Sequence, residues 1–401
     1  MRKRLIWLLA ALLLAGCANR AGEETPVTPV PVPSTPTAAP TATPEPDPIR
    51  ARMANMTLWE KVGQLFFIRP DSLDPNQPQA EINGPSDRPV IGVTDEVARV
   101  LYAYPVGGII LFGKNVVDPA QLRAFTRDLQ ASSEIPLFIG ADEEGGGIAR
   151  IANNRRFPVP QTPVAAALGA QGVNACESAG AAMGQYLRSY GLNLDFAPVA
   201  DVNTNPRNPV IGNRAFSTDG EETARLAGAF ARGLASQGVI PTLKHFPGHG
   251  DTAEDSHDHV AVSRKTAGDL MACEWLPYTE NDLTGWAVMV GHIAVPALTG
   301  DYTPASLSGV IVTNWLRGEL GFEGLVITDS LAMDAVTAQH SPGETAVLAV
   351  KAGCDMLLMP NGLAAAYDGV FTAVENGEIS EERLDESVYR ILSYKQRLGL
   401  L

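Results

Sequence analysis

Eight short apolar runs rich in branched side chains recur along the chain after residue 50, and longer segments with helical periodicity separate them. This alternation is typical of a β/α fold with parallel strands. The predicted strands span residues 65–68, 107–112, 137–142, 192–198, 241–246, 287–293, 324–330 and 356–360. The predicted helical segments include residues 119–132, 174–190, 220–237, 268–282 and 343–352. Eight strands with intervening helices predict a single (β/α)8 TIM-type barrel.

Polar residues stand where several of these strands end. Five of them lie at or near the C-terminal end of a predicted strand: Asp142, Lys244, His245, His292 and Asp329. In a barrel, the loops that leave this end surround a common mouth, which is where active sites form. A doubly wound open sheet is the alternative, but no glycine-rich phosphate loop opens a helix after the first strand. The barrel is therefore preferred.

The N-terminus indicates an exported protein. Basic residues 2–4 precede an apolar run, residues 5–14, which leads into Ala15, Gly16 and Cys17. The run is too short for a permanent spanning helix, and the pattern is similar to a bacterial lipoprotein signal that is cleaved before an acylated cysteine. We expect residues 1–17 to be this signal, with Cys17 lipidated and the protein held on the membrane outside the cytoplasm. An uncleaved anchor, the alternative, leads to the same compartment.

Residues 18–48 consist mostly of Pro, Thr, Ala and Val, with almost no large side chains. Such a tract cannot bury a core and forms a semi-rigid spacer that reaches on the order of 90 Å when it is polyproline-like. We therefore expect a linker over residues 18–48 and one barrel domain over residues 49–401.

The formal net charge of −15 argues against a nucleic-acid partner, because the chain has no basic stripe to neutralise phosphates. Apart from Cys17, the cysteines are Cys176, Cys273 and Cys354, far apart and without metal-ligand spacing. We interpret them as buried thiols, with one disulfide as the alternative. We expect no metal, no cofactor and a monomeric protein.

The segment KHFPGHGDTAEDSHDHV, residues 244–260, is the strongest candidate for chemistry. It leaves a predicted strand and gathers four of the six histidines and four carboxylates in a loop that contains Gly248 and Gly250. Titratable groups on such a loop can reach a substrate. Within it, Asp255 stands two residues before His257 and can orient one ring nitrogen, leaving the other as a general acid and base. A solvated histidine beside an unrelated aspartate is the alternative.

Asp329 follows the apolar run of GLVITDSLAMDAV and precedes a helical pattern. An ionised carboxylate at a barrel mouth can attack an anomeric carbon and stabilise the positive charge that develops there. The alternative is an N-cap on the following helix.

The segments KHFPGHGDTAEDSH, VITDSLAMDA and DEEGGGIAR together resemble the family 3 glycoside hydrolases, in particular the bacterial β-N-acetylhexosaminidases, over roughly residues 50–400. The resemblance implies a retaining double displacement, with Asp329 as nucleophile, His257 as acid and base, and Asp255 as its orienting partner. By the same resemblance, the terminal sugar is bound by Asp142, Arg150, Arg214, Lys244 and His245. His292 is similar to a family position near the site, with no direct role assigned.

The chain also departs from the family pattern. Relatives often carry a basic residue after the paired glycines, where this chain has Gly147, so contacts with the outer sugars are in doubt. The lipoprotein signal and linker differ from cytoplasmic relatives that recycle cell wall. The expected substrate is therefore an external oligosaccharide derived from chitin or peptidoglycan.

Three other functions remain open at this stage. The first is another activity of the same family, either a phosphorylase or a β-glucosidase. A phosphorylase is possible because a neutral histidine repels phosphate less than a carboxylate does. The second is a metal-dependent hydrolase using His245, His249, His257 and His259, although their spacing matches no metal-binding helix motif. The third is a non-catalytic cell-wall-binding lipoprotein built on an enzyme fold.

Overall fold

Eight parallel strands close into a barrel in the computed structural model, which describes residues 47–253 and 260–401. The strand order is β11-β9-β7-β6-β3-β2-β1-β12, and a parallel bridge between Ile327 and Met356 joins the two ends. The bounds are β1 (Phe66–Ile68), β2 (Gly108–Leu111), β3 (Phe138–Ala141), β6 (Leu194–Asp195), β7 (Ile240–Phe246), β9 (Ala287–Val290), β11 (Leu325–Thr328) and β12 (Leu357–Leu358). Each predicted apolar run coincides with one of these strands, so the barrel prediction is confirmed.

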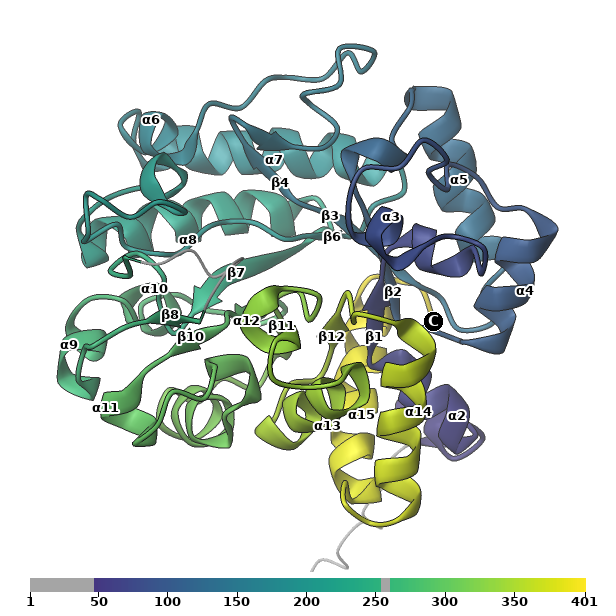
Figure 1. The fold of residues 1–401 in the computed structure, drawn as a ribbon. Helices are drawn as coiled ribbons and strands as arrows, with labels where there is room; N and C mark the ends of the chain where they lie inside the picture. The colour runs from purple at the N-terminus through teal and green to yellow at the C-terminus, as the bar shows by residue number, and fades with distance from the viewer. Residues whose placement is uncertain (1–46, 254–259) are drawn as a thin grey trace, which may run out of the picture. The chain divides into compact units, whose positions relative to one another are not determined.

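Helices surround the strands (Figure 1). Four predicted segments appear as α5 (Pro119–Ala131), α7 (Val173–Ser189), α8 (Gly220–Ser236) and α13 (Pro342–Ala352). Further helices are α1 (Pro48–Met53), α2 (Leu58–Gln64), α4 (Asp95–Ala103), α14 (Leu363–Glu375) and α15 (Glu381–Arg397). No helix in the part of the chain that the structure describes is long and apolar enough to cross a membrane.

The expected continuous helix over residues 268–282 is wrong. The chain forms two short helices there, α9 (Ala267–Ala272) and α10 (Leu276–Thr279), with a break between them. Pro277 lies in the first turn of α10. A proline at this place has no N–H for a helical bond to Cys273, and its ring clashes with that carbonyl, so α9 cannot continue through it.

Aromatic and aliphatic side chains fill the barrel. Phe67 on β1 and Phe196, directly after β6, pack edge to face with their ring centroids 5.2 Å apart. Because two strands separate β1 from β6, this contact crosses the interior, and the barrel is a packed core rather than a pore.

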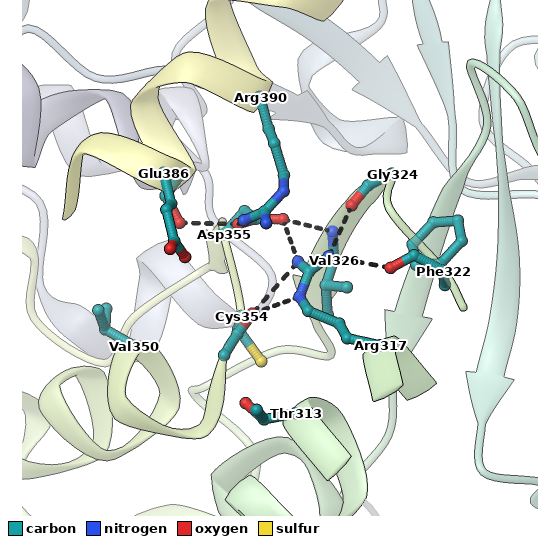
Figure 2. Close-up of polar contacts among 12 residues, drawn as sticks. Thr313, Arg317, Phe322, Gly324, Val326, Val350, Cys354, Asp355, Glu386 and Arg390 are labelled. Atoms are coloured by element: carbon teal, nitrogen blue, oxygen red, sulfur yellow. Dashed lines mark hydrogen bonds and ion pairs between the residues drawn. The ribbon is translucent and has the colours of Figure 1, made fainter. Parts of the chain in front are cut away.

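The C-terminal helix α15 lies against α1 and α2, the first two helices of the described part of the chain. Asp355, a fully buried carboxylate just before β12, binds α15 to the barrel through an ion pair. Arg317 lies 2.6 Å from Asp355 and Arg390 of α15 lies 3.1 Å from it; Figure 2 shows the two guanidinium groups approaching from different elements. Asp355 also accepts a 3.0 Å bond from the Val326 N–H of β11. This cluster stands at the N-terminal ends of the strands, where barrels keep stabilising rather than catalytic residues.

The three described cysteines are free thiols. Cys176 and Cys354 are buried, as expected, while Cys273 is half-buried. The alternative of a disulfide among these three residues is therefore wrong.

Candidate active site

A cavity of about 370 Å³ opens at the C-terminal ends of the barrel strands. Six predicted site residues line it: Asp142, Arg150, Arg214, Lys244, His245 and Asp329. They come from positions as far apart as residues 142 and 329, and only the closure of the barrel brings them together. The catalytic and binding roles assigned to them remain predictions.

Asp329 follows β11 directly and faces the cavity. Its backbone N–H donates to Val290 at the end of β9, and its Oδ1 accepts a 2.7 Å bond from the Ser330 N–H. Burial alone would raise the pKa of Asp329. The nearby imidazoles of His245 and His292 oppose this effect, and the pKa lies below its usual value. Asp329 is therefore ionised at neutral pH, as a nucleophile must be.

An ion-pair chain forms one wall of the cavity, in the order Arg150–Asp142–Lys244–Glu144–Arg214. Lys244 Nζ lies 2.9 Å from Asp142 Oδ1 and 2.7 Å from Glu144 Oε1. Arg150 lies 3.1 Å from Asp142, and Arg214 binds both oxygens of Glu144 at 2.9 and 2.8 Å. Charged groups fixed in this way present rigid donors and acceptors to the hydroxyl groups of a sugar.

The groups of this ion-pair chain stabilise one another in their charged forms. Burial would raise the pKa of Asp142, but Lys244 and Arg150 oppose it, and the pKa lies well below its usual range. Burial would likewise raise the pKa of Glu144, but Lys244 and Arg214 outweigh this effect and lower it. Burial would lower the pKa of Lys244, but the two carboxylates raise it. All three groups are therefore charged at neutral pH.

A short antiparallel hairpin, β4 (Glu143–Gly145) and β5 (Ile148–Ala149), carries Glu144 and places Arg150 next to Asp142. Gly145 and Gly146 turn it with φ values of 95° and 57°, which favour glycine. The fully buried Glu143 side chain accepts bonds from the N–H groups of Ile151 and Ala152, at 2.9 and 2.8 Å, and so fixes the returning strand.

Asp201 fixes His245 of β7 and His249 of the following loop. Its Oδ2 lies 2.7 Å from Nδ1 of His245, and its Oδ1 accepts a 2.7 Å bond from the His249 N–H. Asp201 is fully buried. Its contact with Nδ1 leaves Nε2 of His245 for the cavity.

Two residues of this site, Glu144 and Asp201, were missed by the sequence analysis, and the lining residue His249 was considered only as a ligand in the metal alternative. Glu144 belongs to the quoted DEEGG segment and His249 to the histidine-rich loop, so their places along the chain were signals. Asp201 follows an apolar run, residues 196–200, six residues after β6, and the sequence offers no periodicity that assigns it to His245.

His257 and Asp255 lie outside the described residues, so their proposed pairing stays a prediction. The same applies to two of the four histidines that the metal alternative requires, His257 and His259. Among residues 47–253 and 260–401, no group of three or more histidine, cysteine or acidic side chains is arranged to hold a metal ion.

Comparison with known proteins adds a family to this geometry. The model of the glycosyl hydrolase family 3 N-terminal domain matches residues 57–394. Beta-hexosaminidase A of Pseudoalteromonas piscicida is 33% identical over 332 residues, which cover 76% of this chain and 55% of that protein. Beta-hexosaminidase LpqI of Mycobacterium tuberculosis is 34% identical over 317 residues, which cover 76% of this chain and 80% of that protein.

A solved structure supports the same assignment. A family 3 β-N-acetylglucosaminidase from Paenibacillus sp. str. FPU-7 superimposes with a TM-score of 0.78 and 38% sequence identity, over 86% of this chain and 63% of that one. The chain thus spans little more than half the length of some relatives and most of the length of others. A match over nearly all described residues, together with a barrel of the same shape, leads to one conclusion: the chain belongs to glycosyl hydrolase family 3.

Proposed function

We propose that this protein is a retaining, exo-acting β-N-acetylhexosaminidase that hydrolyses terminal β-linked N-acetylglucosamine from cell-wall or chitin-derived oligosaccharides. The observation that carries the proposal is the position of Asp329, an ionised carboxylate that faces the mouth beside the charged wall of Lys244, Asp142 and Glu144. Relatives that carry the names beta-hexosaminidase and β-N-acetylglucosaminidase support the choice of sugar.

In the proposed mechanism, the Asp329 carboxylate attacks the anomeric carbon while His257 donates a proton to the leaving oxygen. A covalent glycosyl-enzyme forms, and the bond to the aglycone breaks. His257 then takes a proton from water, which attacks the same carbon and releases the sugar with its configuration retained. Asp255 orients the imidazole. Asp142, Arg150, Arg214, Lys244 and His245 hold the terminal sugar.

The location is part of the proposal. We infer that the signal is cleaved before Cys17, that Cys17 is then acylated, and that the linker over residues 18–48 holds a monomeric catalytic domain away from the membrane. Metabolic labelling with an alkyne fatty acid tests this: wild type should carry the label in the membrane fraction, whereas Cys17→Ala should carry none. Equal labelling of both proteins would contradict the anchor.

The activity is tested by p-nitrophenol release from the β-N-acetylglucosaminide and the β-glucoside, with and without phosphate. Asp329→Asn and His257→Ala should both lose activity, by about a thousandfold or more for the nucleophile. Asp368→Asn on α14 and His340→Ala, which lie outside the cavity, are matched controls that should keep wild-type rates. A sugar 1-phosphate product would indicate a phosphorylase, preference for the glucoside would indicate a β-glucosidase, and a silent wild type would favour a binding lipoprotein.

A further inference from the structure

His292 is fully buried two residues after β9, directly behind the proposed nucleophile. Its Nε2 lies 2.8 Å from the carbonyl oxygen of Ser330, the residue that follows Asp329. A carbonyl oxygen only accepts hydrogen bonds, so Nε2 carries a hydrogen and donates it. On the other side of the ring, Nδ1 lies 2.7 Å from the hydroxyl of Ser306. A hydroxyl can donate or accept, so both contacts are satisfied whatever the protonation of Nδ1.

Four bonds fix the segment that leaves β11. The Asp329 N–H donates to Val290 at the end of β9, and the Leu331 N–H donates to Leu358 of β12. Both continue the backbone ladder of the barrel and involve no side chain. The Ser330 carbonyl between them accepts a 2.8 Å bond from the His292 imidazole and a longer one, 3.2 Å, from the Met333 N–H. Among these contacts, His292 supplies the one that comes from a side chain.

This geometry distinguishes the two oxygens of Asp329. Oδ1 accepts the 2.7 Å bond from the Ser330 N–H, so one of its lone pairs is occupied. Within the described residues, no hydrogen bond from the protein reaches Oδ2. Rotation about the Ser330 backbone would move its N–H away from Oδ1 and exchange the roles of the two oxygens.

We propose that His292 is a positioning residue for the nucleophile: by holding the Ser330 carbonyl, it keeps the Ser330 N–H on Asp329 Oδ1 and presents Oδ2 to the anomeric carbon. Ser306 keeps the imidazole in the plane that this contact requires. This inference rests on the proposed function, because it concerns how Asp329 attacks. In this proposal, His292 acts through the Ser330 backbone.

Two substitutions of similar size separate the contact to Ser330 from the contact to Ser306. In His292→Gln, the amide nitrogen reaches the place of Nε2 and can still donate to the carbonyl. In His292→Asn, the amide lies at the place of Nδ1 and falls short of Ser330. We expect His292→Asn to lower kcat on the aryl β-N-acetylglucosaminide by about ten- to a hundredfold, the usual effect of a lost hydrogen bond, with KM within about threefold. His292→Gln should recover most of the rate.

Thermal unfolding of both variants serves as the control for a purely structural role. If kcat follows the melting temperature and not the presence of the Nε2-like donor, or if His292→Asn is as active as wild type, the inference is wrong. Should both variants fail to fold, Ser306→Ala removes only the hydroxyl that orients the imidazole toward Ser330; we expect a smaller fall in kcat, about three- to tenfold, at constant KM. An unchanged kcat in Ser306→Ala would then contradict the inference.

The same experiment distinguishes this inference from the proposed function. A wild type without activity, or an active Asp329→Asn, would overturn the proposed function and the inference together. An active wild type, an inactive Asp329→Asn and a fully active His292→Asn would overturn the inference alone.

Discussion

Glu144 binds the guanidinium of Arg214 through both carboxylate oxygens, at 2.9 and 2.8 Å, and accepts Lys244 at 2.7 Å with one of the same oxygens. The carboxylate is nearly inaccessible, with a side chain that is 7% exposed. Two cations of the predicted sugar-binding set therefore depend on an acidic residue outside that set.

Glu144→Gln should weaken substrate binding more than it slows chemistry. The amide keeps one acceptor oxygen, but its NH₂ group faces a cation that it cannot bind, so Arg214 and Lys244 lose their fixed positions. We expect KM to rise about ten- to a hundredfold and kcat to fall less, which steady-state kinetics will measure. Glu375→Gln, an exposed change at the end of α14, is the control. Wild-type KM in Glu144→Gln would show that the pair does not organise the binding wall.

The pH dependence of kcat/KM should show an acidic limb below about pH 4. Asp329 stays ionised below the ordinary carboxylate range, because burial, which would raise its pKa, is outweighed by His245 and other nearby groups. A positive charge at His245 favours the ionised carboxylate, so His245→Asn should raise the Asp329 pKa and move the acidic limb to higher pH. A limb that stays in place, or that moves to lower pH, would contradict this electrostatic assignment.

Asp355→Asn should destabilise the fold without changing the site. Asp355 has a fully buried side chain facing Arg317 and Arg390 (Figure 2). Arg383 lies 3.9 Å away, so loss of the Asp355 charge leaves partly buried cations uncompensated. We expect the free energy of unfolding to fall by about 3–5 kcal/mol, measured by urea denaturation at pH 7. The exposed Asp87→Asn serves as the control.

The pKa of Asp355 gives this prediction a pH signature. Burial alone would raise that pKa, but the arginines outweigh it and lower it. The folded protein therefore binds the proton less tightly than the unfolded chain, and the contribution of Asp355 is present above about pH 4 and lost as pH falls through the folded value. Asp355→Asn should lack this part of the acid dependence; identical acid profiles in both proteins would contradict the prediction.

Lys395 should make stability rise with pH on the alkaline side. Its fully buried amino group donates to Gln64 and lies 5.1 Å from the centre of the Phe138 ring, and burial lowers its pKa well below the usual value. The unfolded chain therefore binds a proton that the folded protein releases, and the free energy of unfolding increases up to about pH 10.4, by at most about 1.4 kcal/mol per pH unit.

Lys395→Met should remove this slope, which urea unfolding between pH 7 and pH 10 will measure. Lys351→Met removes a lysine that forms an exposed pair with Glu378 and should keep the wild-type slope. Parallel curves for wild type and Lys395→Met would show that Lys395 is charged in the folded protein.

The architecture was predictable because each barrel strand is a separate apolar run that the chain can bury only in a sheet. The runs around residues 109, 243 and 326 all became barrel strands. Strand periodicity carries no information on short additions such as the β4–β5 hairpin, which depends on glycine turns and on the buried Glu143 side chain. The break in the helix before Pro277 was readable from that proline, whose effect outweighs the helical pattern around it.

Six residues predicted from the sequence line the cavity, but the contacts between them were not predictable. Asp142, Lys244 and Asp329 could be placed at strand ends, and barrel geometry brings strand ends together. Which carboxylate pairs with which cation depends on side-chain packing between segments far apart in sequence, as in the contact of Asp201 with His245. The sequence carries no periodic signal for such pairs, so Asp201 and the double role of Glu144 emerged only from the structure.

The central claim, that Asp329 is the nucleophile of a retaining glycosidase, is tested most directly by trapping the glycosyl-enzyme. Wild type and Asp329→Asn would be treated with a slow 5-fluoro N-acetylglucosaminyl fluoride, digested, and mapped by mass spectrometry. A sugar adduct is expected on the peptide that contains Asp329 in wild type, and no adduct is expected in the variant. An adduct on a different carboxylate, or release of the sugar with inverted configuration and no adduct, would contradict it.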